Sequence, residues 1–181
     1  MNEEKKNWKQ ELWEWVKILV AAAVIAFLVN HFVIANSEVP SGSMENTIMT
    51  GDRIIGSRLS YLFGEPERGD IVIFDHENGP AKEEIHYVKR VIGLPGETLD
   101  IKNGHVYIDG SDTPLEEPYL KEAMDPTETL HFEIPEGCYF MMGDNRNRSA
   151  DARGWSDPFV PKDKIIAKAQ FRYYPKPGRV K

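Results

Sequence analysis

The chain has 181 residues, with 22 Lys or Arg against 29 Asp or Glu and a formal net charge of −7. This length suffices for one core, or for a membrane anchor followed by a domain of about 145 residues. Four lysines and four glutamates balance within the first 35 residues, so the acidic excess lies in the remainder of the chain. A domain of this charge repels a phosphate backbone, and no basic stripe with interleaved aromatic residues is present, which argues against nucleic acid as a partner.

The metal-ligating and disulfide-forming residue types are sparse. Cys138 is the only cysteine in the sequence, so it has no partner for an internal disulfide or a thiolate metal site. The five histidines are scattered and form neither a His-x-His nor an HExxH motif. The sequence therefore indicates no metal site.

The first element in chain order is an apolar segment at residues 18–35, ILVAAAVIAFLVNHFVIA. As a helix it would span about 27 Å, close to the hydrocarbon thickness of about 30 Å. Upstream, Trp8, Leu12 and Trp15 recur at the spacing of a helix with one face at a membrane interface. The sequence predicts one transmembrane helix at 18–35, preceded by a cytoplasmic segment at 1–17.

A cleaved signal peptide is the alternative interpretation of this segment. The uninterrupted part, residues 18–29, has the length of a signal-peptide core, and residues 33–35 end at the spacing of a cleavage site. The acidic residues and tryptophans upstream are atypical of a signal peptide and favour a retained anchor. Lysines precede the segment, whereas the first basic residue after it is Arg53, so we expect the remaining domain, 36–181, to be extracytoplasmic.

The remainder of the chain predicts a β-rich domain without further helices. Asn103 and Gly104, between LDIK and HVYID, favour a two-residue hairpin turn because both positions need positive φ. Residues 111–136, with four prolines, are interpreted as an acidic surface excursion between strands. Short runs rich in β-branched residues between Gly, Pro and Asp breaks predict strands at 53–57, 70–74, 85–93, 98–101, 105–109, 138–142 and 165–174.

The stretch PSGSMENT, residues 40–47, places two serines on either side of a glycine. Pro, Ser, Gly and Asn build turns, so the stretch alone is typical of a hinge between anchor and domain. A serine hydroxyl is a poor nucleophile unless a nearby group removes its proton. A catalytic role for one of these serines therefore requires a base from elsewhere in the chain.

The predicted strand IHYVKRVIG, residues 85–93, contains two candidate bases. Lys89 shares one face of the strand with apolar residues, and burial would lower its pKa. Lowering a lysine pKa from about 10.4 to 7 or 8 corresponds to about 3 to 5 kcal/mol. Alternatively, Lys89 extends its ammonium group into water, or His86 is the base, with an acidic partner. Because the two side chains face opposite ways, at most one of them serves the serine.

Three segments in order resemble the bacterial type I signal peptidases, which are membrane-anchored Ser-Lys proteases. They are VPSGSMENTI with GDRII, RGDIVIF leading to YVKRVIGLPGE, and GDNRNRSADARGW at 143–155. The resemblance covers most of the chain from 38 to 169. It implies a mainly β fold, an antiparallel β-sheet protease domain behind one N-terminal transmembrane helix. The chain length matches the small Gram-positive-like forms, with residues 97–140 as a reduced insertion region.

The resemblance also implies roles for individual residues. Ser43 matches the nucleophile and Lys89 its general base. Ser41 matches the residue whose hydroxyl helps the N–H of the nucleophile form the oxyanion hole, and Ser149 matches a serine that orients the lysine amine. Framework positions of the site are matched by Asp144, Arg146, Asp151 and Arg153.

The implied activity is removal of signal peptides from exported preproteins at the outer face of the cell membrane, without metal or organic cofactor. Its partners would be the lipid bilayer and secretory preproteins with small residues at −1 and −3, and the protein would be a monomer. The family commonly has Pro at the position of Asn46 and an acidic residue at Asn147, so loop rigidity and rate are open. The rival functions are a self-cleaving repressor-type Ser-Lys protease and an anchored β-rich binding module in which Ser43 is an ordinary loop residue.

Overall fold

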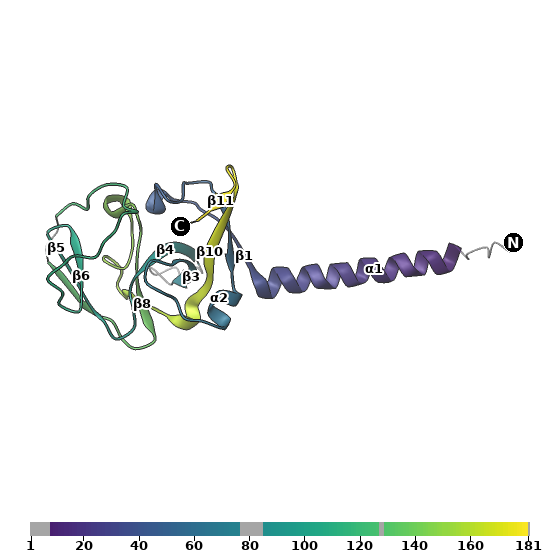
Figure 1. The fold of residues 1–181 in the computed structure, drawn as a ribbon, viewed down its shortest axis with the longest axis horizontal. Coiled ribbons are helices and arrows are strands. Elements are labelled where there is room, and N and C mark those ends of the chain that lie inside the picture. The colour runs from purple at the N-terminus through teal and green to yellow at the C-terminus, as the bar shows by residue number, and fades with distance from the viewer. Residues whose placement is uncertain (1–7, 77–84, 127–128, 181) are drawn as a thin grey trace.

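The computed structural model describes residues 8–76, 85–126 and 129–180, and consists of a β-rich domain from which one long helix projects (Figure 1). Helix α1, Trp8–Leu28, continues through a π-helical turn, η1, Val29–Val33. Among the described residues, this helical stretch is long and apolar enough to cross a membrane, and none of its side chains is buried.

The helical boundaries differ from those predicted for the anchor. Helical structure is already present at Trp8, ten residues before the predicted start, and Ile34 and Ala35 belong to strand β1, Ile34–Glu38. Ala35 is buried and pairs with Gly56 of the next strand. Pairing with a neighbouring strand thus ends the helix two residues before the apolar run ends.

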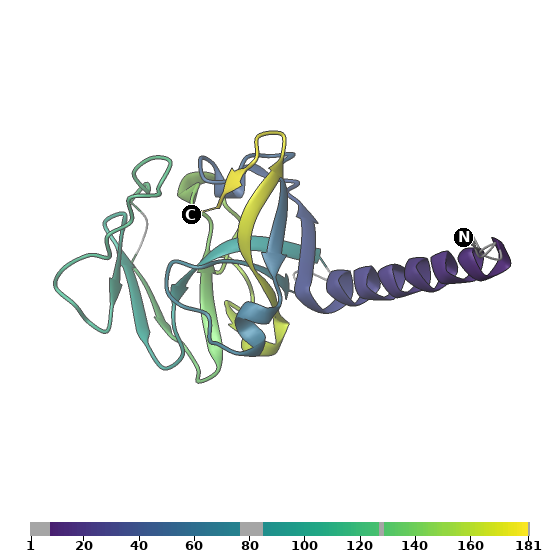
Figure 2. The same cartoon turned by 45° about the vertical axis from the view of Figure 1, so that its right-hand side comes forward.

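The described strands form a main antiparallel sheet in the order β1-β2-β10-β3-β4-β8-β9, with β11 paired to β10 (Figure 2). Its remaining strands are β2, Arg53–Ser57; β3, Ile71–His76; β4, Ile85–Gly93; β8, Cys138–Met142; β9, Phe159–Pro161; β10, Ile165–Tyr174; and β11, Gly178–Arg179. The mainly β, antiparallel fold predicted from the sequence is confirmed.

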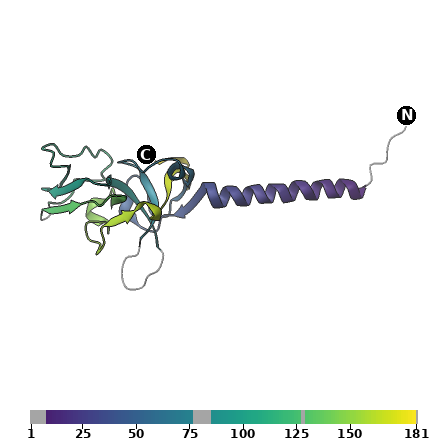
Figure 3. The same cartoon turned by 90° about the horizontal axis from the view of Figure 1, so that it is seen from below.

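A second antiparallel sheet, in the order β6-β5-β7, lies at the end of the domain opposite α1 (Figure 3). Its strands are β5, Thr98–Lys102; β6, His105–Ile108; and β7, Leu130–Glu133. The predicted hairpin joins β5 to β6, and Asn103 and Gly104 have φ of 52° and 76°.

The interpretation of 111–136 as a surface excursion is wrong in part. Strand β7 lies within this segment and pairs with β5. Met124 and Ile134 are buried in the same core as the main sheet, and Leu130 and Phe132 pack against it. The nearby prolines favoured a loop interpretation and so concealed a short strand. The alternate apolar side chains of this strand, Leu130 and Phe132, pack against the core.

The other predicted strands are present within two residues at each end, and the sequence missed the short edge elements. These are β1, β9, β11 and the one-turn helix α2, Leu59–Leu62. The described residues also contain the short 3-10 turns η2, Gly42–Met44; η3, Arg146–Arg148; and η4, Lys162–Lys164. Elements this short carry too few residues to show a hydrophobic period.

Two clusters of buried side chains cover opposite faces of the main sheet where β3 and β4 pair. Val72 and Phe74 contribute to one cluster, and Ile71, Ile73 and Val88 contribute to the other. Successive residues of a strand point to opposite faces, so β4 directs Lys89 and Arg90 into two different environments.

Candidate active site

Ser43 lies on the short turn η2, which follows β1 and is fixed to the domain by apolar and backbone contacts. Met44 and Ile48 are fully buried in the cluster beneath it. On the strand side, the amide of Val39 donates to the Asp52 carbonyl and the amide of Gly51 donates to the Val39 carbonyl. The hinge between helix and domain is therefore ordered, and it presents a serine that is only 6% exposed.

Strand β4 brings Lys89 to this serine. The Nζ atom lies 2.5 Å from Ser43 Oγ, and the lysine is 3% exposed. Burial lowers the pKa of Lys89 from 10.5 to about 8. The carboxylates of Asp151 and Asp144 oppose this lowering of the pKa, and the guanidinium of Arg153 adds to it. A substantial fraction of this amine is therefore neutral near pH 8 and able to accept a proton.

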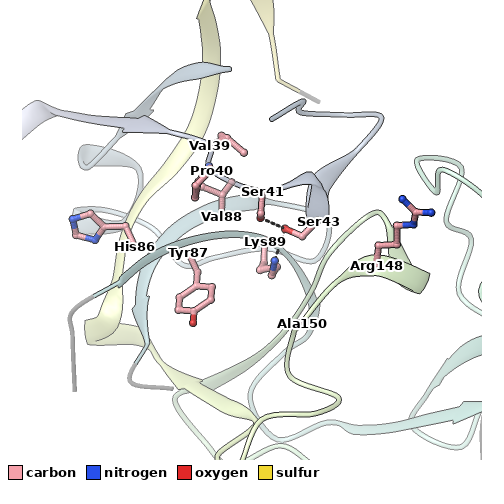
Figure 4. Close-up of a pocket in the computed structure, with 10 residues that line it drawn as sticks. All are labelled: Val39, Pro40, Ser41, Ser43, His86, Tyr87, Val88, Lys89, Arg148 and Ala150. Carbon is pink, nitrogen blue, oxygen red and sulfur yellow. Dashed lines mark hydrogen bonds between the residues drawn. The ribbon is translucent and has the colours of Figure 1, made fainter. Parts of the chain in front are cut away.

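The two serines predicted to assist the pair have different surroundings. Ser41 Oγ donates a hydrogen bond to Ser43 Oγ at 3.3 Å (Figure 4). The Ser149 hydroxyl is buried and has no hydrogen-bond partner among the described residues. A Cβ added to Gly143 would collide with this hydroxyl and with the Ser43 carbonyl, so Ser149 lies close to the turn that carries Ser43. The predicted bond from Ser149 to Lys89 is not formed in this structure, and its orienting role stays a prediction.

Asp144 forms a buried ion pair with Arg90. The Arg90 Nε and Nη2 atoms donate to its two carboxylate oxygens at 2.8 and 2.7 Å, and Thr47 donates at 2.5 Å. The Arg90 guanidinium also lies 3.9 Å from the centre of the Tyr119 ring. These contacts tie β4, the segment after η2 and the turn after β8 to one another on the face opposite Lys89.

The other predicted framework residues gather around Gly143. Arg146 donates to the Gly143 carbonyl at 2.9 Å and forms a bidentate pair with Glu117. Asp151 accepts a bond from the Gly143 amide at 3.0 Å and is held by the Arg153 guanidinium at 2.8 and 2.9 Å. The structure therefore brings all four predicted framework residues to the turn that packs against Ser43.

A pocket of about 300 Å³ contains the Ser-Lys pair and extends along β4 (Figure 4). Apolar side chains of Val39, Pro40 and Val88 lie along one side of it, and His86 stands at one end. His86 Nδ1 lies 2.5 Å from Asp75 Oδ1. Of the two candidate bases, Lys89 is the one that reaches Ser43. Within the described ranges, no group of three His, Cys, Asp or Glu side chains could hold a metal ion.

Known proteins include relatives of this chain. The family model described as "Signal peptidase, peptidase S26" matches residues 12–174. The chain belongs to this family. Signal peptidase I of Bacillus licheniformis is 38% identical over 185 residues, covering 97% of this chain and 96% of that protein. Probable signal peptidase I-1 of Synechocystis sp. is 38% identical over 177 residues, covering 90% and 85%.

A solved structure is also similar. A crystal structure of a signal peptidase I from Enterococcus faecalis V583 matches with a TM-score of 0.47 and 30% identity, covering 57% of this chain and 96% of that one. As a member of the peptidase S26 family, the present protein is a serine peptidase and thus a hydrolase.

Sequence reasoning about this S26 peptidase missed residues that structure places at the site. Arg90 was overlooked although it is a second cation in an otherwise apolar strand, a pattern that indicates a buried pair. Asn145 donates from its side-chain Nδ2 to the Gly42 carbonyl at 2.9 Å. It was overlooked because nothing in the sequence indicates a contact between these two distant positions. Asn147, a departure from the family pattern, does not line the pocket of the Ser-Lys pair; it accepts from the Asp125 N–H at 2.8 Å and donates to the Ala123 carbonyl at 3.0 Å. It thereby fastens a neighbouring loop.

Proposed function

We propose that this protein is a membrane-anchored signal peptidase in which Ser43 is the nucleophile and Lys89 the general base. The observation that carries the proposal is the contact between Lys89 Nζ and Ser43 Oγ at 2.5 Å, formed by a buried lysine with a pKa of about 8. A base with a pKa near the working pH combines a neutral population with useful basicity. Membership of the signal peptidase family supports the same chemistry.

The geometry supports a two-step acyl transfer. The Lys89 amine takes the proton of Ser43 as its oxygen attacks the scissile carbonyl, and the resulting oxyanion accepts hydrogen bonds from the Ser43 N–H and the Ser41 hydroxyl. The Lys89 ammonium then gives its proton to the leaving amine as the peptide bond breaks. Water attacks the ester in the second step and loses a proton to Lys89, and Lys89 gives this proton to the Ser43 oxygen as the ester bond breaks and the acid product leaves. No metal or organic cofactor takes part.

The open edge of β4 supports binding of an extended substrate. The Val91 N–H donates to the backbone carbonyl of Asp70, and the Val91 carbonyl accepts from the Gly69 N–H. Val91 therefore directs its backbone groups towards β3. By strand alternation, His86 and Val88 direct theirs to the other side, where β8 begins to pair only at Arg90. An added strand can therefore lie between this edge and residues 39–41.

The apolar lining of the pocket supports small substrate side chains. Val39 and Val88 line the pocket that holds the Ser-Lys pair. Alternate residues of such a strand point to the same side, which matches recognition of small residues at −1 and −3 of secretory preproteins.

The long helix supports an anchored enzyme. We propose that residues 18–33, the apolar part of this helix, are the membrane anchor, with 1–17 cytoplasmic and the domain from Ile34 onward extracytoplasmic and catalytic, in which 97–140 is the reduced insertion region. Enzyme and preprotein are then held at one bilayer, which raises their effective concentration. One chain supplies both members of the pair, which supports activity as a monomer.

The test is cleavage of a preprotein with alanine at −1 and −3 by the purified full-length chain in lipid vesicles. Ser43→Ala and Lys89→Ala should each abolish cleavage at the signal-peptide junction. Lys102→Ala, a lysine of β5 in the far sheet, is the matched control and should retain wild-type turnover. Near-native cleavage by either site variant would refute the Ser-Lys pair.

The same experiment separates the rival functions. A self-cleaving protein would process its own chain and leave the preprotein intact, and a binding module would hold the preprotein without cleaving it. Orientation is tested by adding protease to intact cells stripped of their wall, which should digest the domain and spare residues 1–17.

A further inference from the structure

The turn that carries Ser43 is held from behind by a residue of the turn after β8. Asn145 immediately precedes η3 and is 1% exposed. Its side-chain Nδ2 donates to the Gly42 carbonyl at 2.9 Å, and its backbone N–H donates to the Ser43 carbonyl at 3.0 Å. One buried residue therefore fixes two consecutive carbonyl groups of η2.

The bond from Asn145 to the Gly42 carbonyl, together with the Glu45 N–H that donates to the same carbonyl at 3.2 Å, also fixes the direction of the next N–H. In a trans peptide the C=O and N–H groups of one planar unit point in opposite directions. The Gly42 carbonyl and the Ser43 N–H belong to the same unit. Holding that carbonyl against Asn145 therefore directs the Ser43 N–H to the other side of the unit, away from Asn145.

Ser43 is the second residue of the 3-10 turn η2, Gly42–Met44, and the first N–H groups of such a turn have no carbonyl acceptor within it. A buried backbone N–H without an acceptor is rare, because its burial costs a free energy comparable to the loss of one hydrogen bond. An N–H of this kind beside the nucleophile is a donor held ready for a group that arrives with the substrate.

We propose that Asn145 is a positioning residue that aims the Ser43 N–H at the substrate carbonyl oxygen and so builds the oxyanion hole. This inference rests on the proposed function, since it requires Ser43 to attack a carbonyl. Asn145 touches neither the substrate nor the reacting atoms; it acts through the Gly42–Ser43 peptide.

A simple stabilising role is the competing explanation, and the chain offers a matched control for it. Asn147 lies two residues further along the same turn and is also hydrogen-bonded through its amide, but to residues 122–125. Its loss should loosen that loop without altering the Gly42–Ser43 peptide. Asn147→Ala should therefore retain wild-type kinetics on a short peptide substrate.

The experiment compares two substrates in the full-length enzyme, a peptide with an ordinary scissile amide and the same peptide with a thioamide. Sulfur is a poor hydrogen-bond acceptor, so an enzyme with an intact oxyanion hole should prefer the oxygen substrate. We expect Asn145→Ala to lower kcat on the amide about 10- to 100-fold with KM changed less than about threefold. The preference for oxygen over sulfur should fall by at least about fivefold, because the two changes remove the same interaction.

The outcomes distinguish the explanations. A lower kcat with an unchanged oxygen-to-sulfur preference would assign Asn145 to stability alone and overturn the inference, as would an unchanged kcat. The pH midpoint of activity should not move, because Lys89 is left intact. If Asn145→Ala does not fold, Asn145→Ser, which also lacks the amide, provides the same comparison. Activity remaining in Ser43→Ala would instead refute the proposed function itself.

Discussion

Two neighbouring cations of β4, Lys89 and Arg90, are both buried and yet have opposite surroundings. Arg90 donates to both oxygens of Asp144 and is stacked on Tyr119. Lys89 has the hydroxyl of Ser43 as its direct partner, and the nearest carboxylates only partly offset the lowering of its pKa. Two adjacent residues of one strand thus differ in charge state: Arg90 is a charged group paired with a carboxylate, and Lys89 loses its proton at a lowered pKa.

The difference follows from what each side chain can do. A guanidinium keeps its charge and offers a planar fork that matches a carboxylate, so a buried arginine requires a fixed counter-charge. An ammonium group can lose its proton when burial disfavours the charge. The cation bonded to a carboxylate therefore stabilises the fold, whereas the proposed chemistry belongs to the cation that is bonded to a hydroxyl.

The largest expected effect is on catalysis. Lys89→Met should lower turnover of a preprotein by about 10⁴-fold, or about 5 kcal/mol, because methionine fills the space without accepting a proton. Turnover is measured with a purified preprotein in vesicles. A loss below about tenfold would mean that another group takes the proton of Ser43.

Removing the neighbouring cation should affect folding instead. Arg90→Met leaves Asp144 buried without its ion-pair partner and should lower the free energy of unfolding by about 3 to 5 kcal/mol. Chemical denaturation in detergent measures the change. The double variant Arg90→Met with Asp144→Leu should recover part of the loss, and failure to recover any of it would contradict the assignment to an unpaired charge.

The two substitutions should also change the free energy of unfolding in opposite directions, because Arg90→Met lowers it and Lys89→Met raises it below pH 8. Between pH 8 and 10.5 the unfolded chain holds a proton on Lys89 that the folded chain has lost, so wild-type stability rises with pH in this window. Lys89→Met removes this dependence and should be more stable than wild type below pH 8, by on the order of 3 kcal/mol. Denaturation of both proteins at several pH values should show the difference shrinking towards pH 10.5. A constant difference would mean that the lysine is not the group responsible.

The smallest expected effect is on the pH midpoint of activity, compared with that of an enzyme whose base is a histidine. Activity should rise with pH and reach half its maximum near pH 8, as the Lys89 amine becomes neutral. The measurement is kcat/KM across pH with a short peptide substrate. A midpoint near 6.5 would instead point to a histidine, and His86 would be the candidate.

Local patterns predicted much of the fold. The β-branched run at 85–93, the Asn103-Gly104 turn and the apolar N-terminal segment each carry their signal within a few residues. Strand β7 was missed because prolines surround it and its partner β5 lies about thirty residues away. The end of the helical stretch at Val33 was also missed, because pairing of β1 with β2 decides it.

The sequence by itself determined the residue types, the strand periodicity and the three family segments, and these were enough to single out Ser43 and Lys89. Only the tertiary structure decided their surroundings. The contacts of Lys89 with Ser43, of Arg90 with Asp144 and of Asn145 with Gly42 each join residues that are 46 to 103 positions apart in the sequence. The same distant packing buries Lys89 and so lowers its pKa. Burial and hydrogen-bond direction depend on such distant packing, whereas periodicity depends on neighbours along the chain.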